Sequence, residues 1–213
     1  IDIGLNYLRE SIDLDPTAPF YNNLGLVQEQ SEDLDSAQHS YEQAIALNPN
    51  FPQSHYNLGN VFQKKSQFEP AINEYQKATH LKQDYALAYN NLGYVLQKMG
   101  LLYEAEISLR NCLKITPSSL DALINLASVF YYLGNYDEAI ICTNKILAIT
   151  PHNAEAYKYL CLSQYGMGEL EKAIKSCEKA LVQQENKEIF FTILGTIHES
   201  SGNKQEATRF YRQ

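Results

Sequence analysis

The stretch YNNLGLVQEQ, residues 21–30, places a glycine inside a run that otherwise has the apolar spacing of a helix. A glycine in a helix interior costs about 1 kcal/mol relative to alanine, so its presence needs a reason. Related stretches return at intervals of 34 residues: HYNLGNVFQK at 55–64, YNNLGYVLQK at 89–98 and LINLASVFYY at 123–132. The chain is therefore built from internal repeats, and their period is the first guide to its architecture.

The repeat divides almost the whole chain into units, whose positions we number 1 to 34. Complete repeats are predicted at 18–51, 52–85, 86–119, 120–153 and 154–187, followed by an incomplete repeat at 188–213. Residues 1–17 match the second helix of an earlier repeat. Because no insertion interrupts the register, we predict one domain over residues 1–213.

Three positions of the repeat carry its packing. Position 7 is always leucine, position 20 is always alanine, and position 8 is always small. The residues at position 8 are Gly25, Gly59, Gly93, Ala127, Cys161 and Gly195. Small residues at positions 8 and 20 let two helices approach closely, while a residue at position 24, most often aromatic or apolar, fills the space between them. Gly25 is thus predicted to be a packing residue.

Position 15 predicts where the first helix of each repeat ends. It is glycine in four repeats, at Gly100, Gly134, Gly168 and Gly202. Glycine often ends a helix in the left-handed conformation, which other residues adopt at a cost. Each repeat is therefore expected to be a helix, a tight turn and a second antiparallel helix.

This pattern resembles the tetratricopeptide repeat family along the whole chain. The resemblance rests on the small residue at position 8, the alanine at position 20 and the apolar residue at position 24, which recur in register. It implies an all-α fold, a right-handed superhelical solenoid of antiparallel helix pairs. It also implies a concave groove, lined by the first helices, that binds segments of other proteins.

Composition excludes several other functions. Seventeen Lys and Arg face twenty-five Asp and Glu, a net charge of −8, which argues against nucleic acid as a partner. No apolar run is long enough to span a bilayer, so no membrane association is expected. The four cysteines have no zinc-ligand spacing, and three occupy small core positions. We predict buried thiols in a reducing, cytoplasmic setting, with no metal and no cofactor.

The histidines offer no catalytic motif, and we predict that the chain is not an enzyme. None of the five lies in a recognisable nucleophile, phosphate-loop or zinc motif. His55 falls at position 4 and His198 at position 11, both on the apolar face of a first helix. For both we expect a hydrogen-bonded core histidine.

The predicted binding site begins with a row of asparagines at position 6, namely Asn23, Asn57, Asn91 and Asn125. A carboxamide donates and accepts hydrogen bonds, so such a row can hold the backbone of an extended peptide without reading its side chains. The row is similar to the asparagine ladder in the tetratricopeptide domain of O-linked N-acetylglucosamine transferase. The alternative is that these amides are solvated or bridge neighbouring helices.

Other groove residues change in character along the chain. The candidates are Asn60, Tyr94 and Lys98 in the earlier repeats, and Tyr132, Lys158 and Tyr165 in the later ones. Exposed tyrosines in a groove suit the anchoring of a partner, although Tyr131 and Tyr159 equally suit packing between repeats. A carboxylate clamp, found in chaperone-binding members of the family, is not expected: Lys158 occupies its position 5, but Leu162 and Ile193 stand where asparagines would be needed.

The leading functional prediction is a protein–protein interaction scaffold that binds an extended peptide or partner segment in its groove. Two alternatives stay open: the substrate-recruiting arm of a larger enzyme such as a glycosyltransferase, and a self-assembling scaffold. Both ends stop inside a repeat, which favours further repeats in a longer protein. Apolar residues exposed there predict weak self-association: Ile3, Leu5, Tyr7 and Leu8 at one end, Phe210 and Tyr211 at the other.

Overall fold

The computed structural model describes residues 15–183 and 187–213, and in these ranges it contains twelve α-helices and no strand. The first helices of the repeats are α2 (Ala18–Gln30), α4 (Pro52–Lys64), α6 (Ala86–Lys98), α8 (Leu120–Leu133), α10 (Ala154–Gly166) and α12 (Glu188–Ser200). The second helices are α3 (Leu34–Leu47), α5 (Phe68–Leu81), α7 (Leu102–Ile115), α9 (Tyr136–Ile149), α11 (Leu170–Gln183) and α13 (Lys204–Tyr211). Every first helix begins at position 1 and every second helix at position 17, so the predicted all-α repeat array is confirmed.

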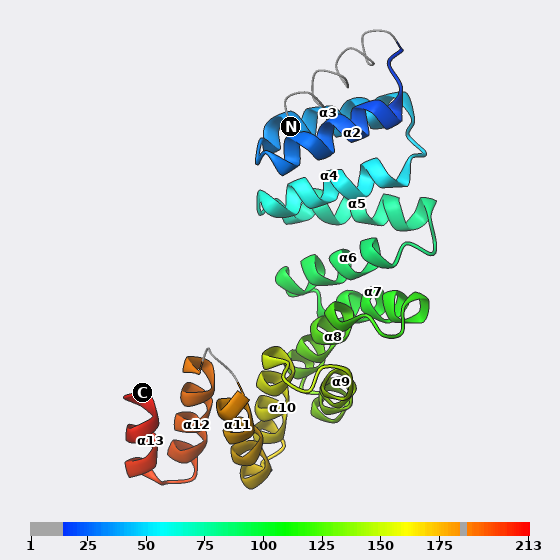
Figure 1. Cartoon of the computed structure of the whole chain (residues 1–213). Helices are drawn as coiled ribbons and strands as arrows, with labels where there is room; N and C mark the ends of the chain where they lie inside the picture. The colour runs from blue at the N-terminus through cyan, green and yellow to red at the C-terminus, as the bar shows by residue number, and fades with distance from the viewer. Residues whose placement is uncertain (1–14, 184–186) are drawn as a thin grey trace. The chain divides into compact units, whose positions relative to one another are not determined.

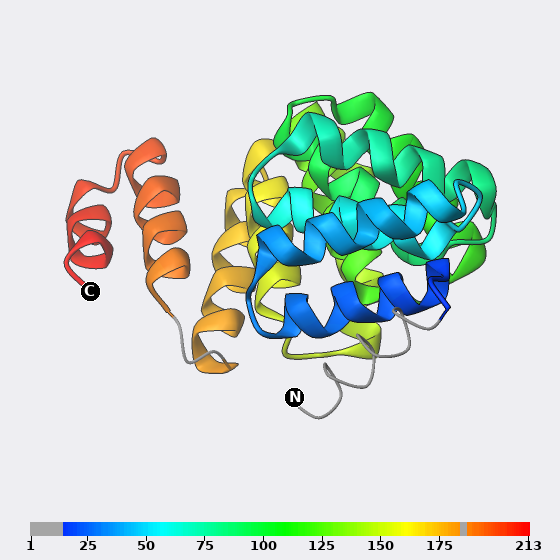
Figure 2. The same cartoon turned by 90° about the horizontal axis from the view of Figure 1, so that it is seen from above.

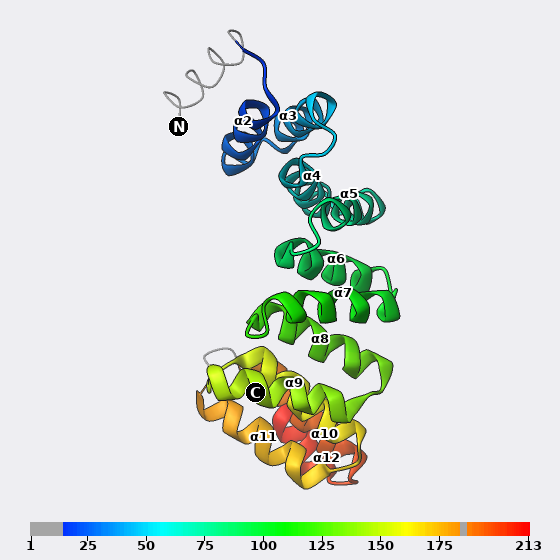
Figure 3. The ribbon, with the colours of Figure 1, turned by 90° about the vertical axis from the view of Figure 1, so that its right-hand side faces the viewer.

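The chain forms two compact units, residues 1–117 and 118–213, which we call the N-terminal and C-terminal units. The division falls between the third and fourth repeats. In the N-terminal unit each first helix packs against its own second helix, and α4 and α6 also contact the preceding repeat. Figure 3 shows the pairs α2/α3 and α4/α5 almost end-on, with the two helices of each pair side by side. The prediction of one continuous domain stays a prediction.

The C-terminal unit repeats the same arrangement. Its helix α10 packs against α8, α9, α11 and α12, and α12 packs against α13 (Figures 1 and 2). One continuous apolar core joins the last two repeats, from Tyr157 on α10 to Ile197 on α12. Within this unit, each repeat thus covers the apolar face of the next one.

The structure explains the glycines at position 8. A Cβ atom added at Gly25 would lie 2.6 Å from the ring of Tyr41, and one added at Gly59 would lie 2.7 Å from the ring of Tyr75. At Gly93 the nearest atom would be Cγ of Leu109, at 2.5 Å. Ordinary carbon contacts are about 3.5–4 Å, so no side chain fits without displacing the residue at position 24. The prediction that Gly25 is a packing residue is confirmed.

The turns between paired helices are also as predicted, with one addition. The four glycines at position 15 have φ between 76° and 80°, in the left-handed region. The first two repeats adopt the same turn without glycine, through Glu32 at φ 60° and Ser66 at φ 58°. A residue with a Cβ atom is strained in this conformation by about 1 kcal/mol. These repeats therefore keep the turn at a cost in stability.

The cysteines are buried and free, as predicted. Cys161 at position 8 and Cys177 at position 24 face each other in the fifth repeat, where both side chains are fully buried. A hydrogen bond donated to Cys161, together with burial, raises the pKa of the Cys177 thiol. A raised pKa disfavours the reactive thiolate, so Cys177 serves as a core residue.

The prediction about apolar residues at the two ends can be compared with the structure at the C-terminal end. Ile3, Leu5, Tyr7 and Leu8 lie outside the described residues. At the other end, the ring of Phe210 stacks on His198 at 5.4 Å and on Phe191 at 6.3 Å. Tyr211 covers Gly195 and is still 50% exposed.

Candidate functional site

A cavity of about 330 Å³ opens on the first-helix side of the N-terminal unit, between α2 and α4. Its lining residues are Leu26, Glu29, Gln30, Tyr56, Asn57, Asn60 and Lys64. Asn57 and Asn60 belong to the predicted groove, and the structure brings them together here. The remaining lining residues supply an apolar side chain, an aromatic ring and a charged pair, a combination typical of peptide-binding surfaces.

The floor of the cavity is an amide bridge between neighbouring first helices. Nδ2 of Asn57 donates to Oδ1 of Asn22 at 3.0 Å, and the same oxygen accepts from the Ser54 hydroxyl at 3.1 Å. Asn57 is only 8% exposed. Among the described residues no donor reaches Oδ1 of Asn57, so this atom keeps its capacity to accept a hydrogen bond.

A second bridge joins α4 to α6. Nδ2 of Asn91 donates to Oδ1 of Asn60 at 3.0 Å and lies 3.3 Å from the Tyr56 hydroxyl. Oδ1 of Asn60 also accepts from the buried Tyr75 hydroxyl at 2.8 Å. Asn57 and Asn91 therefore both use their amide donors on the preceding first helix. The alternative that asparagines of position 6 bridge neighbouring helices is thus confirmed for Asn57 and Asn91.

The rim of the cavity carries a fixed charged pair. Nζ of Lys64 lies 2.7 Å from Oε1 of Glu29, and the Tyr41 hydroxyl donates to Oε2 of the same carboxylate at 2.9 Å. Burial raises the pKa of Tyr41, and the negative charge of Glu29 raises it further. The hydroxyl thus stays protonated and holds the carboxylate in place. A preorganised rim loses little side-chain freedom when a ligand binds.

The other predicted residues of the N-terminal unit lie outside this cavity. Asn23 is exposed on α2. On α6, Nζ of Lys98 lies 5.2 Å from the centre of the Tyr94 ring. This is a cation–π contact between residues one helical turn apart.

The C-terminal unit gathers tyrosines from α8, α9 and α10. The Tyr131 ring lies 5.3 Å from Tyr132, 6.0 Å from Tyr136 and 6.1 Å from Tyr159. Tyr165 is close enough to contribute to the raised pKa of Tyr131, which is caused mainly by burial. We call these five residues the tyrosine cluster.

The members of the tyrosine cluster differ in exposure. Tyr159 is buried, and its hydroxyl accepts from Ser128 at 2.7 Å, so the alternative of packing between repeats is confirmed for this residue. Tyr132 is 62% exposed, and Tyr131, Tyr136 and Tyr165 are half-buried. Gly166 makes room for the Tyr136 ring, which a Cβ atom would meet at 2.5 Å.

A lysine joins the tyrosine cluster. Nζ of Lys158 lies 4.5 Å from the centre of the Tyr159 ring and is also paired with Glu155. Burial alone would lower the pKa of Lys158, but Glu155 and Tyr159 outweigh this and raise it. Asn125, the last asparagine of the predicted row, is half-buried on α8 in the same unit.

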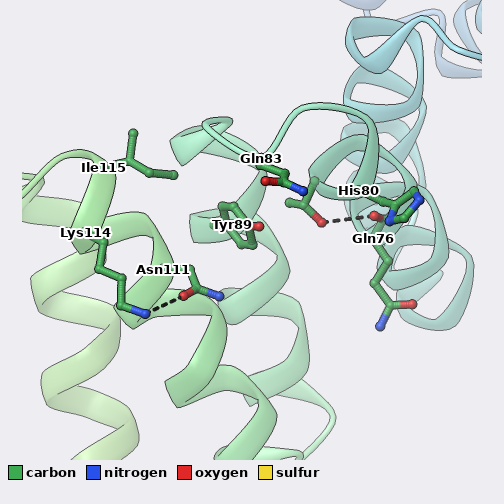
Figure 4. A pocket seen from close by; sticks show the side chains of 8 residues that line it. Gln76, His80, Gln83, Tyr89, Asn111, Lys114 and Ile115 are labelled. Atoms are coloured by element: carbon green, nitrogen blue, oxygen red, sulfur yellow. Dashed lines mark hydrogen bonds between the residues drawn. The ribbon is translucent and has the colours of Figure 1, made fainter.

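A larger cavity, of about 520 Å³, lies on the second-helix side of the N-terminal unit (Figure 4). Its walls come from the ends of α5 and α7 and the start of α6, and they are mostly neutral and polar. Nζ of Lys114 donates to Oδ1 of Asn111 at 3.2 Å, and Tyr89 lies between them and His80 in the view. This cavity gathers none of the residues predicted from the sequence.

The predicted core histidines have different surroundings. His55 is 4% exposed, with Nδ1 2.6 Å from Oε2 of Glu74 and Nε2 2.9 Å from the Pro49 carbonyl, so the hydrogen-bonded core position is confirmed. His198 is half-buried and stacks on Phe210. Burial alone would raise the pKa of Glu74, but its hydrogen bonds to His55 and Lys77 outweigh burial and lower it.

The described residues offer neither a metal site nor a membrane-spanning helix. No group of three or more His, Cys, Asp or Glu side chains in residues 15–183 and 187–213 is arranged to hold a metal ion. None of the described helices is long and apolar enough to cross a membrane.

Comparison with known proteins identifies the family. A family model of the TPR repeat matches residues 30–66 and 64–100, and a tetratricopeptide repeat model matches residues 84–151. Together the matches span residues 30–151, more than half of the 213-residue chain. The chain therefore belongs to the tetratricopeptide repeat family. No curated protein sequence matches it.

Solved structures share the fold. YrrB, a TPR protein with an unusual peptide-binding site, aligns with a TM-score of 0.80 and 21% identity over 86% of this chain and 95% of its own. PilW, a widely conserved type IV pilus biogenesis factor, gives a TM-score of 0.77 and 20% identity over 91% of this chain and 90% of its own. MamA gives a TM-score of 0.75 and 26% identity over 80% of this chain and 93% of its own.

Proposed function

We propose that this chain is a non-enzymatic interaction scaffold whose N-terminal unit binds an extended segment of a partner protein on its first-helix side. The observation that carries the proposal is the cavity between α2 and α4, which brings Asn57 and Asn60 together with the Lys64–Glu29 pair. The peptide-binding site of YrrB, which has a similar fold, supports the same class of function.

The contacts in this cavity suit a peptide backbone. Oδ1 of Asn57 is an available acceptor for a backbone N–H, and the Lys64 ammonium can donate to a backbone carbonyl at the rim. Leu26 is 38% exposed beside them and offers an apolar contact for a partner side chain. Asn57 thus offers an acceptor to the ligand, while its amide donor holds α4 against α2.

Asn57 is proposed to contribute an acceptor to the ligand, in a row similar to the ladder of O-linked N-acetylglucosamine transferase. A recruiting arm of a larger enzyme would use the same surface, and the sequence that follows Gln213 in the whole protein would distinguish the two. We also propose a reducing cytoplasmic location, which the four buried free thiols favour.

The test begins with a peptide selected from a displayed random library against the purified chain. Its affinity is measured by fluorescence anisotropy for the wild type, for Leu26→Ala/Lys64→Ala and for Asn57→Ala. We expect the double variant to bind about tenfold more weakly and Asn57→Ala about fivefold more weakly, at roughly 1 kcal/mol per hydrogen bond. Asn144→Ala, an exposed asparagine on α9, is the matched control and should bind as the wild type does.

Circular dichroism separates lost binding from lost folding, because Asn57 also bridges α2 and α4. Unchanged affinity in both folded variants would show that the cavity is not the binding site.

A further inference from the structure

We propose that the tyrosine cluster of the C-terminal unit is a docking surface for a positively charged, arginine- or lysine-bearing segment of the partner. This inference rests on the proposed scaffold function and names the chemistry of the ligand at a second place on the chain. Its first support is the geometry of the rings. The ring centres of Tyr132, Tyr136 and Tyr159 lie 5.3 to 6.1 Å from that of Tyr131, and Tyr132 is 62% exposed.

Aromatic faces attract cations. The ring quadrupole is negative over its face, and an ammonium or guanidinium within about 6 Å gains roughly 0.5–1 kcal/mol at an exposed site. The cluster already demonstrates this preference, because Nζ of Lys158 lies 4.5 Å from the centre of the Tyr159 ring. Lys158 makes this cation–π contact with the buried Tyr159 ring, so Tyr132 and the half-buried rings stay accessible to a ligand.

The surrounding charges favour a cation as well. Helices α8, α9 and α10 carry four carboxylates, Asp121, Asp137, Glu138 and Glu155, against two lysines, Lys145 and Lys158. Lys158 is paired with Glu155, so these two charges cancel and leave Asp121, Asp137 and Glu138 against Lys145. Asp137 and Glu138 are exposed and directly follow Tyr136.

The helix ends add to this field. Tyr131 and Tyr132 lie in the last turn of α8, and Tyr165 lies in the last turn of α10. Carbonyl groups at a helix C-terminus carry a partial negative charge, which stabilises a nearby cation by about 0.3–1 kcal/mol. The positive N-terminus of α9 is offset by Asp137 and Glu138 in its first turn. Rings, carboxylates and helix ends therefore all select the same sign of ligand.

The experiment uses fluorescein-labelled peptides of alternating glycine and arginine, with citrulline or glutamate in place of arginine as neutral and acidic versions. Binding to the whole chain is measured at about 0.15 M salt, which screens distant charges. We expect the arginine peptide to bind more tightly than either other peptide. Tyr132→Leu should weaken it about threefold and Tyr131→Leu/Tyr132→Leu about tenfold, whereas Tyr132→Phe, which keeps the ring, should bind like the wild type.

The matched control is Tyr103→Leu, because Tyr103 is 71% exposed on α7 of the other unit and lies outside the tyrosine cluster. Equal binding of the citrulline peptide would overturn the inference, since charge would then not matter. Loss of binding in Tyr132→Phe, or an equal loss in Tyr103→Leu, would also overturn it. The variants of the α2/α4 cavity lie in the other unit, so the proposed function can fail there while this surface still binds.

Discussion

The two units solve the same packing problem in different ways. In the N-terminal unit, position 8 is glycine and position 24 is large, in the pairs Gly25/Tyr41, Gly59/Tyr75 and Gly93/Leu109. In the first two repeats of the C-terminal unit the pairs are Ala127/Thr143 and Cys161/Cys177, and all four side chains are buried. The constraint therefore acts on the combined volume of the pair rather than on either residue.

The residue at position 24 is also related to the side chain at position 12 of the same repeat. A tyrosine at position 24 extends its hydroxyl past the core to position 12 of the same repeat. Tyr41 reaches Glu29, Tyr75 reaches Gln63, and Tyr211 reaches Glu199, at 2.7 to 2.9 Å. Where position 24 is Thr143 or Cys177, position 12 is itself a tyrosine, Tyr131 or Tyr165. Position 12 therefore carries a polar group that bonds to the tyrosine at position 24, or, where position 24 is Thr143 or Cys177, a half-buried tyrosine.

The largest expected effect comes from breaking a pair in the N-terminal unit. Gly93→Leu should destabilise the protein by about 3 kcal/mol or more, because even a Cβ atom would lie 2.5 Å from Leu109 Cγ. Urea unfolding followed by circular dichroism would measure this. As a control, Gly93→Ala/Leu109→Thr recreates the Ala127/Thr143 pair and should be more stable than Gly93→Ala alone. If Gly93→Leu unfolds at the wild-type midpoint, the volume constraint is wrong.

A smaller, pH-dependent effect on stability is expected from the His55–Glu74 pair of the N-terminal unit. The C-terminal unit has no such pair in its first repeat, where the equivalent residues are Leu123 and Cys142. The pKa of Glu74 is lower in the folded protein than its ordinary value of 4.5. Its ionised form therefore contributes stability above about pH 4.5, and this contribution is lost as the pH falls through the folded pKa.

Glu74→Gln should accordingly make the loss of stability below pH 4.5 shallower. Melting temperatures measured across this acidic range test it. Glu171→Gln, which changes an exposed carboxylate of α11, is the control and should keep the wild-type slope. A slope unchanged by Glu74→Gln would mean that other carboxylates govern acid unfolding.

The smallest expected effect on stability concerns the turns. The two turns without glycine, at Glu32 and Ser66, both lie in the N-terminal unit. Glu32→Gly and Ser66→Gly should each stabilise the protein by about 0.5–1 kcal/mol, because glycine relieves the strain of a positive φ. Thermal melting of the single and double variants measures the gain. Gly134→Ala, at φ 77° in the C-terminal unit, should show the opposite sign. Destabilisation by both glycine substitutions would show that the native side chains make contacts worth more than the strain.

Most of the fold could be predicted because each packing position is repeated six times. Leucine at position 7, alanine at position 20 and the small residue at position 8 fix the helix faces without reference to tertiary contacts. The turn at Ser66 could not be predicted in this way, because serine seldom adopts the left-handed conformation. The turn is held by local backbone hydrogen bonds, from Ser66 to the Gln63 carbonyl and from Gln67 to the Phe62 carbonyl.

The candidate site was only partly accessible from the sequence. Asn57 and Asn60 were found through their periodicity, but their bridging role depends on Asn22 and Asn91 from neighbouring helices. Glu29 was missed because position 12 has no fixed residue type. The sequence feature that could have indicated Glu29 is Tyr41, at position 24 of the same repeat. Only the packing of the two helices shows that positions 12 and 24 lie within hydrogen-bond distance.

The restriction of helix contacts to the same or adjacent repeats has a kinetic consequence. Within each unit, helices that contact one another are never more than two apart along the chain. Such a topology has a low contact order, so little loop-closure entropy is lost before native contacts form. Each unit should fold rapidly from any pair of adjacent helices. Nascent repeats could therefore become ordered during synthesis, before the rest of the chain has emerged from the ribosome.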